Sequence, residues 1–252
     1  MVRPELRVLF EDNHLLVVDK PAGLATMGTG DSDSVHGLAC EYIRRKYNKP
    51  GKVYLGVVHR LDSMTSGAIV LARTSKAAAR LSEQFRRAAA GPGKTYLAVL
   101  DSDCGSLGRR GTLTDEIVKN EREHRMEIAQ ADVSATLDPV DRAGVDRRDD
   151  ASALAVLDYE RIDTADRRVT LVRVELKTGR KHQIRTQFAH RGYPVWGDVK
   201  YGAKRRGVIG IALHAVRLSI THPTAKTEMT FVSPVPKAWS DWFPAIENWP
   251  RF

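Results

Sequence analysis

The chain has 252 residues and a mass of 28.0 kDa, with 40 Lys and Arg against 31 Asp and Glu, a formal charge of +9 and a pI of about 9.7. This length is enough for one large domain with a substantial buried core. Cys40 and Cys104 have no CxxC partner, which excludes a disulfide framework and a zinc knuckle and is typical of a reducing cytoplasm. The positive charge favours a polyanionic partner, with nucleic acid as the leading class.

The sequence gives no sign of export or of membrane insertion. The first residues lack the apolar segment of a signal peptide, and no later stretch approaches the roughly 20 apolar residues that a membrane span requires. Heptad repeats, which would indicate a coiled-coil assembly, are also missing. We therefore expect a monomer in the cytoplasm, with no membrane partner.

The first 100 residues predict strands and two helices. Apolar residues at helical spacing from Val35 to Tyr47 follow the N-cap candidate Ser34 and indicate a helix that ends before Pro50. The alanine-rich segment 76–90 predicts a second helix, stopped by the glycines and the proline of 91–93. Short apolar runs predict strands at 6–10, 14–20, 55–58, 68–72 and 94–100.

The rest of the chain continues the mixed pattern. Residues 111–150 are charge-dense and weakly periodic, and we expect a mobile insertion there. Further elements are an antiparallel pair at 154–162 and 169–176, a helix at 182–191 with Gly192 as its C′ residue, and strands at 211–220 and 228–232. The aromatic tail, 238–252, is expected to pack on the body. This order predicts an α+β fold as a single domain over 1–252, with a mixed, mostly antiparallel sheet, flanking helices and a central cleft.

Asp62 lies in the loop HRLDSMTSG, residues 59–67, between two predicted strands. Asp, Ser, Thr and Gly all favour tight turns, so the carboxylate has a plain structural explanation. Loops held between buried strands also commonly carry function. The choice between these interpretations depends on what other segments bring to the carboxylate.

Several familiar catalytic motifs are absent from the sequence. It contains no GxxxxGK[ST], no GxGxxG after a strand and no GxSxG, so a nucleotide cofactor has no support. The histidines are scattered and form neither HExxH nor a paired Cys/His set. We expect no cofactor and no metal.

Arginines and a tyrosine are the candidate partners of Asp62. Arg60 is its neighbour in sequence, and Arg185 in the segment HQIR is a candidate from far along the chain. A nearby guanidinium keeps a partly buried carboxylate ionised, as a nucleophile or base requires. Tyr96 offers an aromatic face and a hydroxyl. The alternatives are that Arg185 is a surface residue of small effect and that Tyr96 is half-buried core.

The loop HRLDSMTSG resembles the signature loop of the RluA-type family of RNA pseudouridine synthases. Four further segments resemble this family, in the same order along the chain: LFEDNHLLVVDKPAGL, KTYLAVL, LKTGRKHQIRTQFAHRGYPVWGDVKYG and LHAVRLSITHP. The resemblance covers nearly the whole chain except 111–150. It implies a pseudouridine synthase fold and an enzyme that acts on rRNA or tRNA without a cofactor or metal.

The resemblance also implies roles for individual residues. Asp62 is implied as the catalytic carboxylate, Arg185 as its salt-bridge partner and Tyr96 as the aromatic residue that stacks on the target uracil. Arg60 is implied to hold the RNA around the extruded nucleotide. Whether Asp62 attacks C1′, attacks C6 or abstracts a sugar proton stays open. The assignment requires that Asp62 lie in a cleft beside Arg185.

We assign substrate or RNA contacts to further residues of the same motifs: His59, Arg60, Lys94, Thr178, Gly179, Arg180, His182 and Gln183. Residues 178–180 either cap the following helix or present N–H groups to phosphates. The basic cluster of Lys200, Arg205 and Arg206 is either an RNA contact or solvated surface.

Two features depart from the family pattern. Lys181 stands where a threonine commonly precedes HQIR, and TQF follows in place of the more usual VHL. Local substrate contacts are therefore expected to differ. We also expect no S4-like N-terminal domain, so that target selection resides in the catalytic domain or in partners.

Two other function classes compete with the synthase. One is a non-catalytic RNA-binding or chaperone module on the same scaffold, which has no need of a carboxylate in a cleft that attracts phosphates. The other is a metal-dependent hydrolase that uses the histidines.

Overall fold

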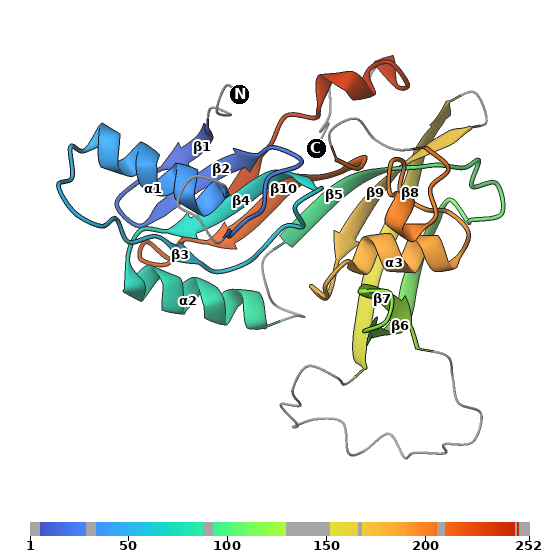
Figure 1. Ribbon diagram of the computed structural model, residues 1–252, viewed down its shortest axis with the longest axis horizontal. Coiled ribbons are helices and arrows are strands. Elements are labelled where there is room, and N and C mark those ends of the chain that lie inside the picture. Colours follow the sequence, from blue (N-terminus) through green and yellow to red (C-terminus); the bar gives the residue numbers. More distant parts are fainter. Residues whose placement is uncertain are drawn as a thin grey trace.

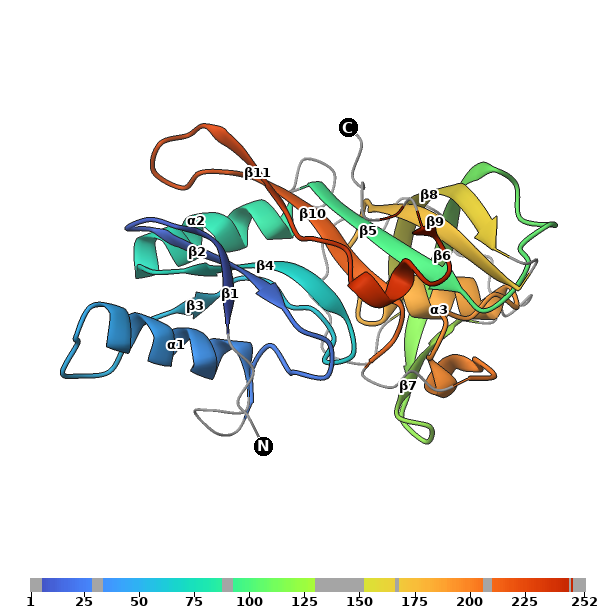
Figure 2. The ribbon, with the colours of Figure 1, turned by 90° about the horizontal axis from the view of Figure 1, so that it is seen from above.

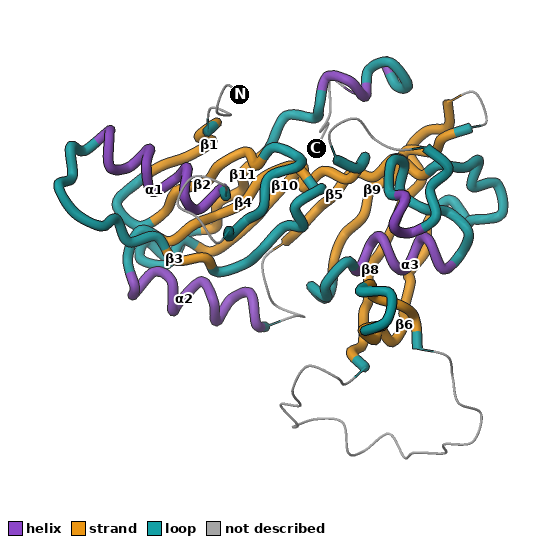
Figure 3. The backbone as a smooth tube through the Cα atoms, in the orientation of Figure 1, coloured by secondary structure: helices purple, strands orange, loops and turns teal. Residues whose placement is uncertain are grey.

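The computed structural model describes residues 6–28, 34–87, 93–129, 152–165, 168–205, 210–244 and 246. Within these ranges, eleven strands form one sheet that carries three α-helices and two short 3-10 helices (Figure 1). Strands dominate the body of the molecule (Figure 3). The predicted α+β class with a mixed sheet is confirmed.

The strands occur in chain order as β1 (Arg7–Glu11), β2 (Leu15–Lys20), β3 (Gly56–Val57), β4 (Ser66–Ala72), β5 (Gly93–Leu100), β6 (Arg110–Asn120), β7 (Arg125–Ile128), β8 (Ala153–Ala165), β9 (Val169–Leu176), β10 (Leu213–Thr221) and β11 (Glu228–Val232). Their order across the sheet is β1-β2-β4-β10-β5-β9-β8-β6-β7, with β11 beside β10 and β3 beside β4. The pairings are antiparallel except that of β4 with β10, which is parallel.

The parallel contact of β4 with β10 requires a glycine. Gly67 lies opposite Ala215 and has a φ of +118°, and a Cβ there would lie 2.3 Å from the Ala215 carbonyl oxygen. Only glycine combines this backbone conformation with so close an approach. The contact places the end of the loop 59–67 directly against β10.

Two of the three helices begin with a side-chain N-cap, one of which was predicted. Helix α1 (Val35–Lys46) has Ser34 as its N-cap, whose hydroxyl accepts the Gly37 N–H as predicted. Helix α2 (Ser75–Arg86) is capped in the same way by Thr74. It ends at Arg86 and not at the predicted residue 90, because the backbone of Arg87 leaves the helical region with a ψ of 83°. Residues 88–92 lie outside the described ranges.

Helix α3 (Gln183–His190) ends as predicted and begins differently. Arg191 is its C-cap, and Gly192 follows with a φ of +80°, the left-handed conformation expected of a C′ glycine. Its N-cap is His182, which also has a positive φ, of 54°, and whose side chain makes no capping bond. Residues 178–180 therefore do not cap the helix.

The segment that begins at residue 111 corrects the predicted insertion in part. Residues up to Ile128 form β6 and β7, and β6 pairs with β8 along most of its length. Only Leu113 and Ile117 of β6 are buried, so the alternation of a half-exposed strand was too weak to recognise. Residues 130–151 lie outside the described ranges.

Strand β5 runs through the middle of the sheet (Figure 2). Its two faces pack against two different hydrophobic clusters. On one face, Tyr96, Ala98 and Leu100 belong to a cluster that includes buried residues of α1 and α3. On the other face, Leu97 and Val99 pack with the tail residues Trp239, Phe243 and Ile246. The described part of the tail therefore packs on the body as predicted, and residues 245 and 247–252 lie outside the described ranges.

Candidate active site

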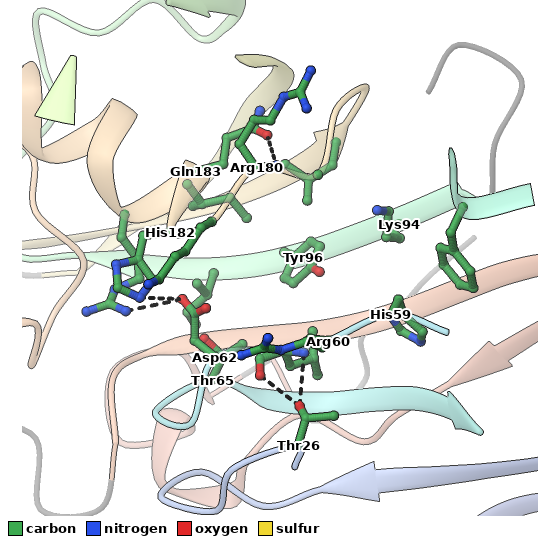
Figure 4. Close-up of a pocket in the computed structure, with 18 of the residues that line it drawn as sticks. Thr26, His59, Arg60, Asp62, Thr65, Lys94, Tyr96, Arg180, His182 and Gln183 are labelled. Carbon is green, nitrogen blue, oxygen red and sulfur yellow. Dashed lines mark hydrogen bonds and ion pairs between the residues drawn. The ribbon is translucent and has the colours of Figure 1, made fainter. Parts of the chain in front are cut away.

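A cleft of about 840 Å³ crosses the sheet at β5. Its walls come from residues 25–27, the loop 58–65, the end of α2, β5 and the segment 176–185 (Figure 4). The structure brings together in this cleft every site residue predicted from the sequence: Asp62, Tyr96, Arg185, His59, Arg60, Lys94, Thr178, Gly179, Arg180, His182 and Gln183.

The backbone of the loop around Asp62 is held on both sides. Leu61 exchanges two hydrogen bonds with the Thr26 hydroxyl, at 2.8 and 3.2 Å. The carbonyl oxygen of Ser63 accepts the Gly23 N–H. The backbone carbonyl oxygen of Asp62 accepts the N–H of Thr65 at 3.0 Å, which closes a tight turn. The turn interpretation of the loop is therefore right, and the same turn fixes the backbone of Asp62.

A buried lysine ties this loop to the preceding one. The Lys20 ammonium donates to the carbonyl oxygens of Pro21, Leu24 and Ser63 at 2.9, 2.6 and 2.9 Å, and its side chain is fully buried. Burial lowers the pKa of Lys20 to about 8, against the opposing charge of Asp62. Lys20 therefore supplies three backbone contacts behind the cleft.

Asp62 forms an ion pair with Arg185 at the floor of the cleft. The Arg185 Nη1 is 3.1 Å from Asp62 Oδ2, and the Asp62 side chain remains 26% exposed, so a substrate in the cleft can reach it. The guanidinium also binds Asp198 through Nε and Nη2 at 2.6 and 2.9 Å and lies over the Tyr201 ring at 4.8 Å. Arg185 is thus held from behind and offers one further N–H group to Asp62.

Tyr96 lies on the wall of the cleft beside Asp62 (Figure 4). Its side chain is 7% exposed, and burial together with the Asp62 charge raises the pKa of its hydroxyl. Among the described residues, no hydrogen-bond partner is found for this hydroxyl. Tyr96 is therefore part of the core, as the structural alternative held, yet it also faces the cleft with an unused polar group.

Cations surround the mouth of the cleft. Arg60 and Lys181 are exposed and have no ion-pair partner within the described part of the chain. Lys94 lies over the Phe85 ring at 5.6 Å, and the Arg180 guanidinium donates to the Leu154 carbonyl oxygen at 2.9 Å. These four positive charges are available to an anionic ligand.

Three of the predicted RNA-contact residues use their side chains within the scaffold. The His59 ring stacks on Phe85 at 4.3 Å and accepts the Val70 N–H, and burial lowers its pKa to about 3. Gln183 accepts from the Thr178 hydroxyl and from the Arg180 N–H, and donates to the Val156 carbonyl oxygen. The side chains of His59, Thr178 and Gln183 therefore form part of the cleft wall.

His182 connects Asp62 to a neighbouring tyrosine. Its Nε2 is 3.8 Å from Asp62 Oδ2, and its Nδ1 is 2.7 Å from the Tyr201 hydroxyl oxygen. Burial lowers the pKa of His182 to about 4, with Asp62 opposing and nearby cations adding to the effect. The imidazole is therefore uncharged near neutral pH.

Other predicted features lie away from the cleft or have no counterpart in it. Lys200 donates to the His124 carbonyl oxygen, and Arg206 of the same basic cluster lies outside the described ranges.

Within the described residues, no three His, Cys, Asp or Glu side chains are grouped so that they could hold a metal ion. In the same ranges, no helix is long and apolar enough to cross a membrane.

The sequence interpretation missed Asp198 and Tyr201, which hold Arg185. Both lie in the motif WGDVKYG, and Asp198 is 2% exposed. The sequence offered one signal for Asp198. A buried arginine needs a charged partner, and Asp198 follows the predicted buried Arg185 by 13 residues.

Residues 14–190 match the family described as RNA pseudouridylate synthase. The chain belongs to this family. Among curated members, the ribosomal large subunit pseudouridine synthase D of Xanthomonas campestris pv. campestris is 36% identical over 247 residues, which cover 92% of this chain and 66% of that protein. The RNA pseudouridine synthase YhcT of Bacillus subtilis is 33% identical and covers 92% and 69%. The chain thus spans about two thirds of these relatives.

Other family members agree with the fold and with the RluA-type assignment. The dual-specificity RNA pseudouridine synthase RluA of Haemophilus influenzae is 29% identical, over 91% of this chain and 93% of that protein. The human RNA pseudouridylate synthase domain containing 4 has the same fold, with a TM-score of 0.71 at 23% identity over 95% of this chain and 92% of the human chain. The predicted family and fold are therefore confirmed.

Proposed function

We propose that this family member converts specific uridines in RNA to pseudouridine, with Asp62 as the catalytic carboxylate. The observation that carries the proposal is the pairing of Asp62 with Arg185 at 3.1 Å in a cleft from which the carboxylate remains accessible. A turn-forming aspartate has no need of a buried guanidinium with its own buried counter-ion. A nucleophile or base needs its charge maintained and its lone pairs directed.

The reaction that fits one carboxylate is an isomerisation. The C1′–N1 bond of uridine breaks, the uracil turns and a C1′–C5 bond forms, while C5 loses a proton and N1 gains one. Atoms and electrons balance without a co-reactant. A glycosidase needs a second carboxylate to protonate the leaving group or to activate water, whereas here the base stays in the cleft. Asp62 acts as nucleophile at C1′ or C6, or as base on the sugar.

The target base must leave its helix to reach Asp62, at a cost of a few kcal/mol. Tyr96 lies where an extruded uracil can stack on it, which returns part of that cost. The cations around the mouth, Arg60, Lys94, Arg180 and Lys181, are placed to contact the phosphates on either side. Arg60, two residues before Asp62 in the loop, is the residue that we propose fills the space left by the extruded base.

The names of the relatives support ribosomal RNA as the substrate. The Xanthomonas relative is named a ribosomal large subunit pseudouridine synthase, and the Haemophilus relative a dual-specificity RNA pseudouridine synthase. We therefore propose large-subunit rRNA as the primary substrate of this chain, with tRNA as the alternative. We further propose that it acts as a monomer in the cytoplasm, a compartment that suits two cysteines without a disulfide.

The test is to map pseudouridine chemically in rRNA and tRNA from cells with and without the protein. The proposal predicts that a defined rRNA uridine loses its modification without the protein and regains it with wild type or with Asp103→Asn, an exposed control outside the cleft. Asp62→Asn should not restore it. Restoration by Asp62→Asn removes Asp62 from the mechanism, and RNA binding without any missing pseudouridine indicates a non-catalytic RNA-binding module.

A further inference from the structure

His182 lies between Asp62 and Tyr201, with one ring nitrogen facing each. The Nε2–Oδ2 distance to Asp62 is 3.8 Å, and Nδ1 is 2.7 Å from the Tyr201 oxygen. We propose that His182 is a positioning residue, which Tyr201 holds in the uncharged form that carries its proton on Nε2, so that one N–H donor is directed at Asp62.

The carboxylate selects the proton position from one side. A neutral imidazole has one N–H donor and one bare nitrogen that accepts, whereas an ionised carboxylate only accepts. The nitrogen that faces Asp62 is therefore favoured as the donor. Figure 4 shows the His182 ring directed toward Asp62 across the floor of the cleft.

Tyr201 selects the same proton position from the other side. Its oxygen accepts the N–H of Met126 in β7 at 3.0 Å. The phenolic proton is then left for the bare Nδ1 of His182. Burial raises the pKa of the Tyr201 hydroxyl, which keeps this proton in place. Both neighbours therefore favour the proton of His182 on Nε2.

An uncharged donor has an advantage over a second cation at this position. Arg185 already opposes the charge of Asp62. A further full charge would hold the carboxylate lone pair more tightly and weaken Asp62 as a nucleophile or base. Lys181, Lys200 and Arg185, together with burial, keep His182 neutral against the pull of Asp62. A neutral N–H orients the carboxylate without that cost.

The 3.8 Å separation is longer than a hydrogen bond, and it shortens to one with a movement of less than about 1 Å. Such contacts commonly tighten only when substrate fills the site. The effect on catalysis rests on the proposed function. The proton position itself does not, so the two are tested separately.

The first experiment reads the proton position by ¹⁵N NMR of the histidine side chains at neutral pH. His182→Gln identifies the His182 signals by their loss. The wild type should show a proton on Nε2 and a bare Nδ1, and Tyr201→Phe, which keeps the ring beneath Arg185, should show a mixture of both forms. A proton on Nδ1 in the wild type, or an unchanged ring in Tyr201→Phe, overturns the proposal.

The second experiment compares His182→Gln with His182→Asn in pseudouridine formation. The amide N–H of Gln reaches the position of Nε2 and that of Asn the position of Nδ1. His182 has a φ of 54°, a conformation that Asn tolerates better than Gln. If His182 mattered only for its backbone conformation, the Asn variant would therefore be the more active of the two. We expect the reverse: kcat falls by about 10-fold for Asn and by no more than about 3-fold for Gln, with similar KM for RNA.

An Asn variant as active as the Gln variant, or more active, overturns the positioning role. A wild type that forms no pseudouridine on any RNA contradicts the proposed function instead, and it leaves the NMR result as the test of the proton position.

Discussion

Arg185 contacts two carboxylates that differ in their surroundings. Asp198 is almost fully buried and takes the two-pronged contact, whereas Asp62 takes a single contact at the edge of the cleft. Because the stronger contact is on the buried side, the guanidinium can stay fixed even when the proposed reaction changes the contacts of Asp62. A planar group with donors on several edges is needed for both contacts at once.

Arg185→Lys should therefore lower activity strongly while the fold persists. A lysine ammonium is a point charge and cannot hold Asp198 with two donors and also reach Asp62. We expect kcat/KM to fall by about 100-fold, which corresponds to roughly 2.7 kcal/mol of transition-state stabilisation. Steady-state kinetics measures this. Arg44→Lys, at an exposed pair with Glu41, is the matched control, and equal effects of the two substitutions would refute the role of Arg185.

His214 lies at the junction of the loop 59–67 with β10. Its ring bonds to the Ser66 hydroxyl at 2.8 Å and to the Ser233 carbonyl oxygen at 3.3 Å, and it is 1% exposed. Burial lowers its pKa to about 4, whereas an unfolded histidine titrates near about 6.5. Between these values the unfolded chain binds the extra proton, so the free energy of unfolding falls as the pH falls.

His214→Gln removes this linkage and predicts a pH-dependent difference in stability. The variant should be less stable than wild type near pH 7.5. At pH 5 this difference in the free energy of unfolding should be smaller by about 2 kcal/mol, because one proton contributes about 1.4 kcal/mol per pH unit below 6.5. Urea denaturation at the two pH values measures the difference. A difference that does not change with pH would mean that His214 binds its proton equally well in the folded and the unfolded protein, which would contradict the lowered pKa.

The pairing of β4 with β10 holds the end of the loop 59–67, and it predicts that one added methyl group at Gly67 is costly. Gly67→Ala should lower the free energy of unfolding by about 2–5 kcal/mol, because the Cβ meets the Ala215 backbone and the positive φ is strained. Gly51→Ala, where a Cβ meets nothing within 4 Å, should change it by less than about 0.5 kcal/mol. Similar unfolding midpoints for both variants would contradict the close approach.

Elements whose structure depends on residues close together in the sequence could be predicted from the sequence alone. The caps at Ser34 and Gly192 and the β8–β9 pair follow from turn chemistry and short-range periodicity. The strand order and the neighbours of Arg185 do not, because they depend on residues far apart. Asp62 and Arg185 are 123 positions apart, and their pairing came from the family resemblance. The tyrosine behind Arg185 had no local signal that distinguished it from core.

The whole molecule carries a charge of +9, and part of this positive charge lies at the cleft, where RNA is proposed to bind. RNA affinity should fall as salt rises, because phosphate contacts release counterions. Arg60→Gln should reduce the slope of log K against log salt by about 0.7–0.9, the release expected from one contact. Arg45→Gln, at a helix pair with Glu41 outside the cleft, should leave the slope unchanged. Binding across a salt series measures both, and equal slopes for the two variants would place the RNA elsewhere.

The central claim is that Asp62 breaks and remakes the bond between the sugar and the base. RNA labelled with tritium at C5 of uridine tests it most directly, because formation of the C1′–C5 bond releases that tritium to water. Wild-type protein should release tritium from its target RNA to the extent of one atom per modified uridine. Asp62→Asn should bind the same RNA and release none. Release by Asp62→Asn at the wild-type rate would contradict the account.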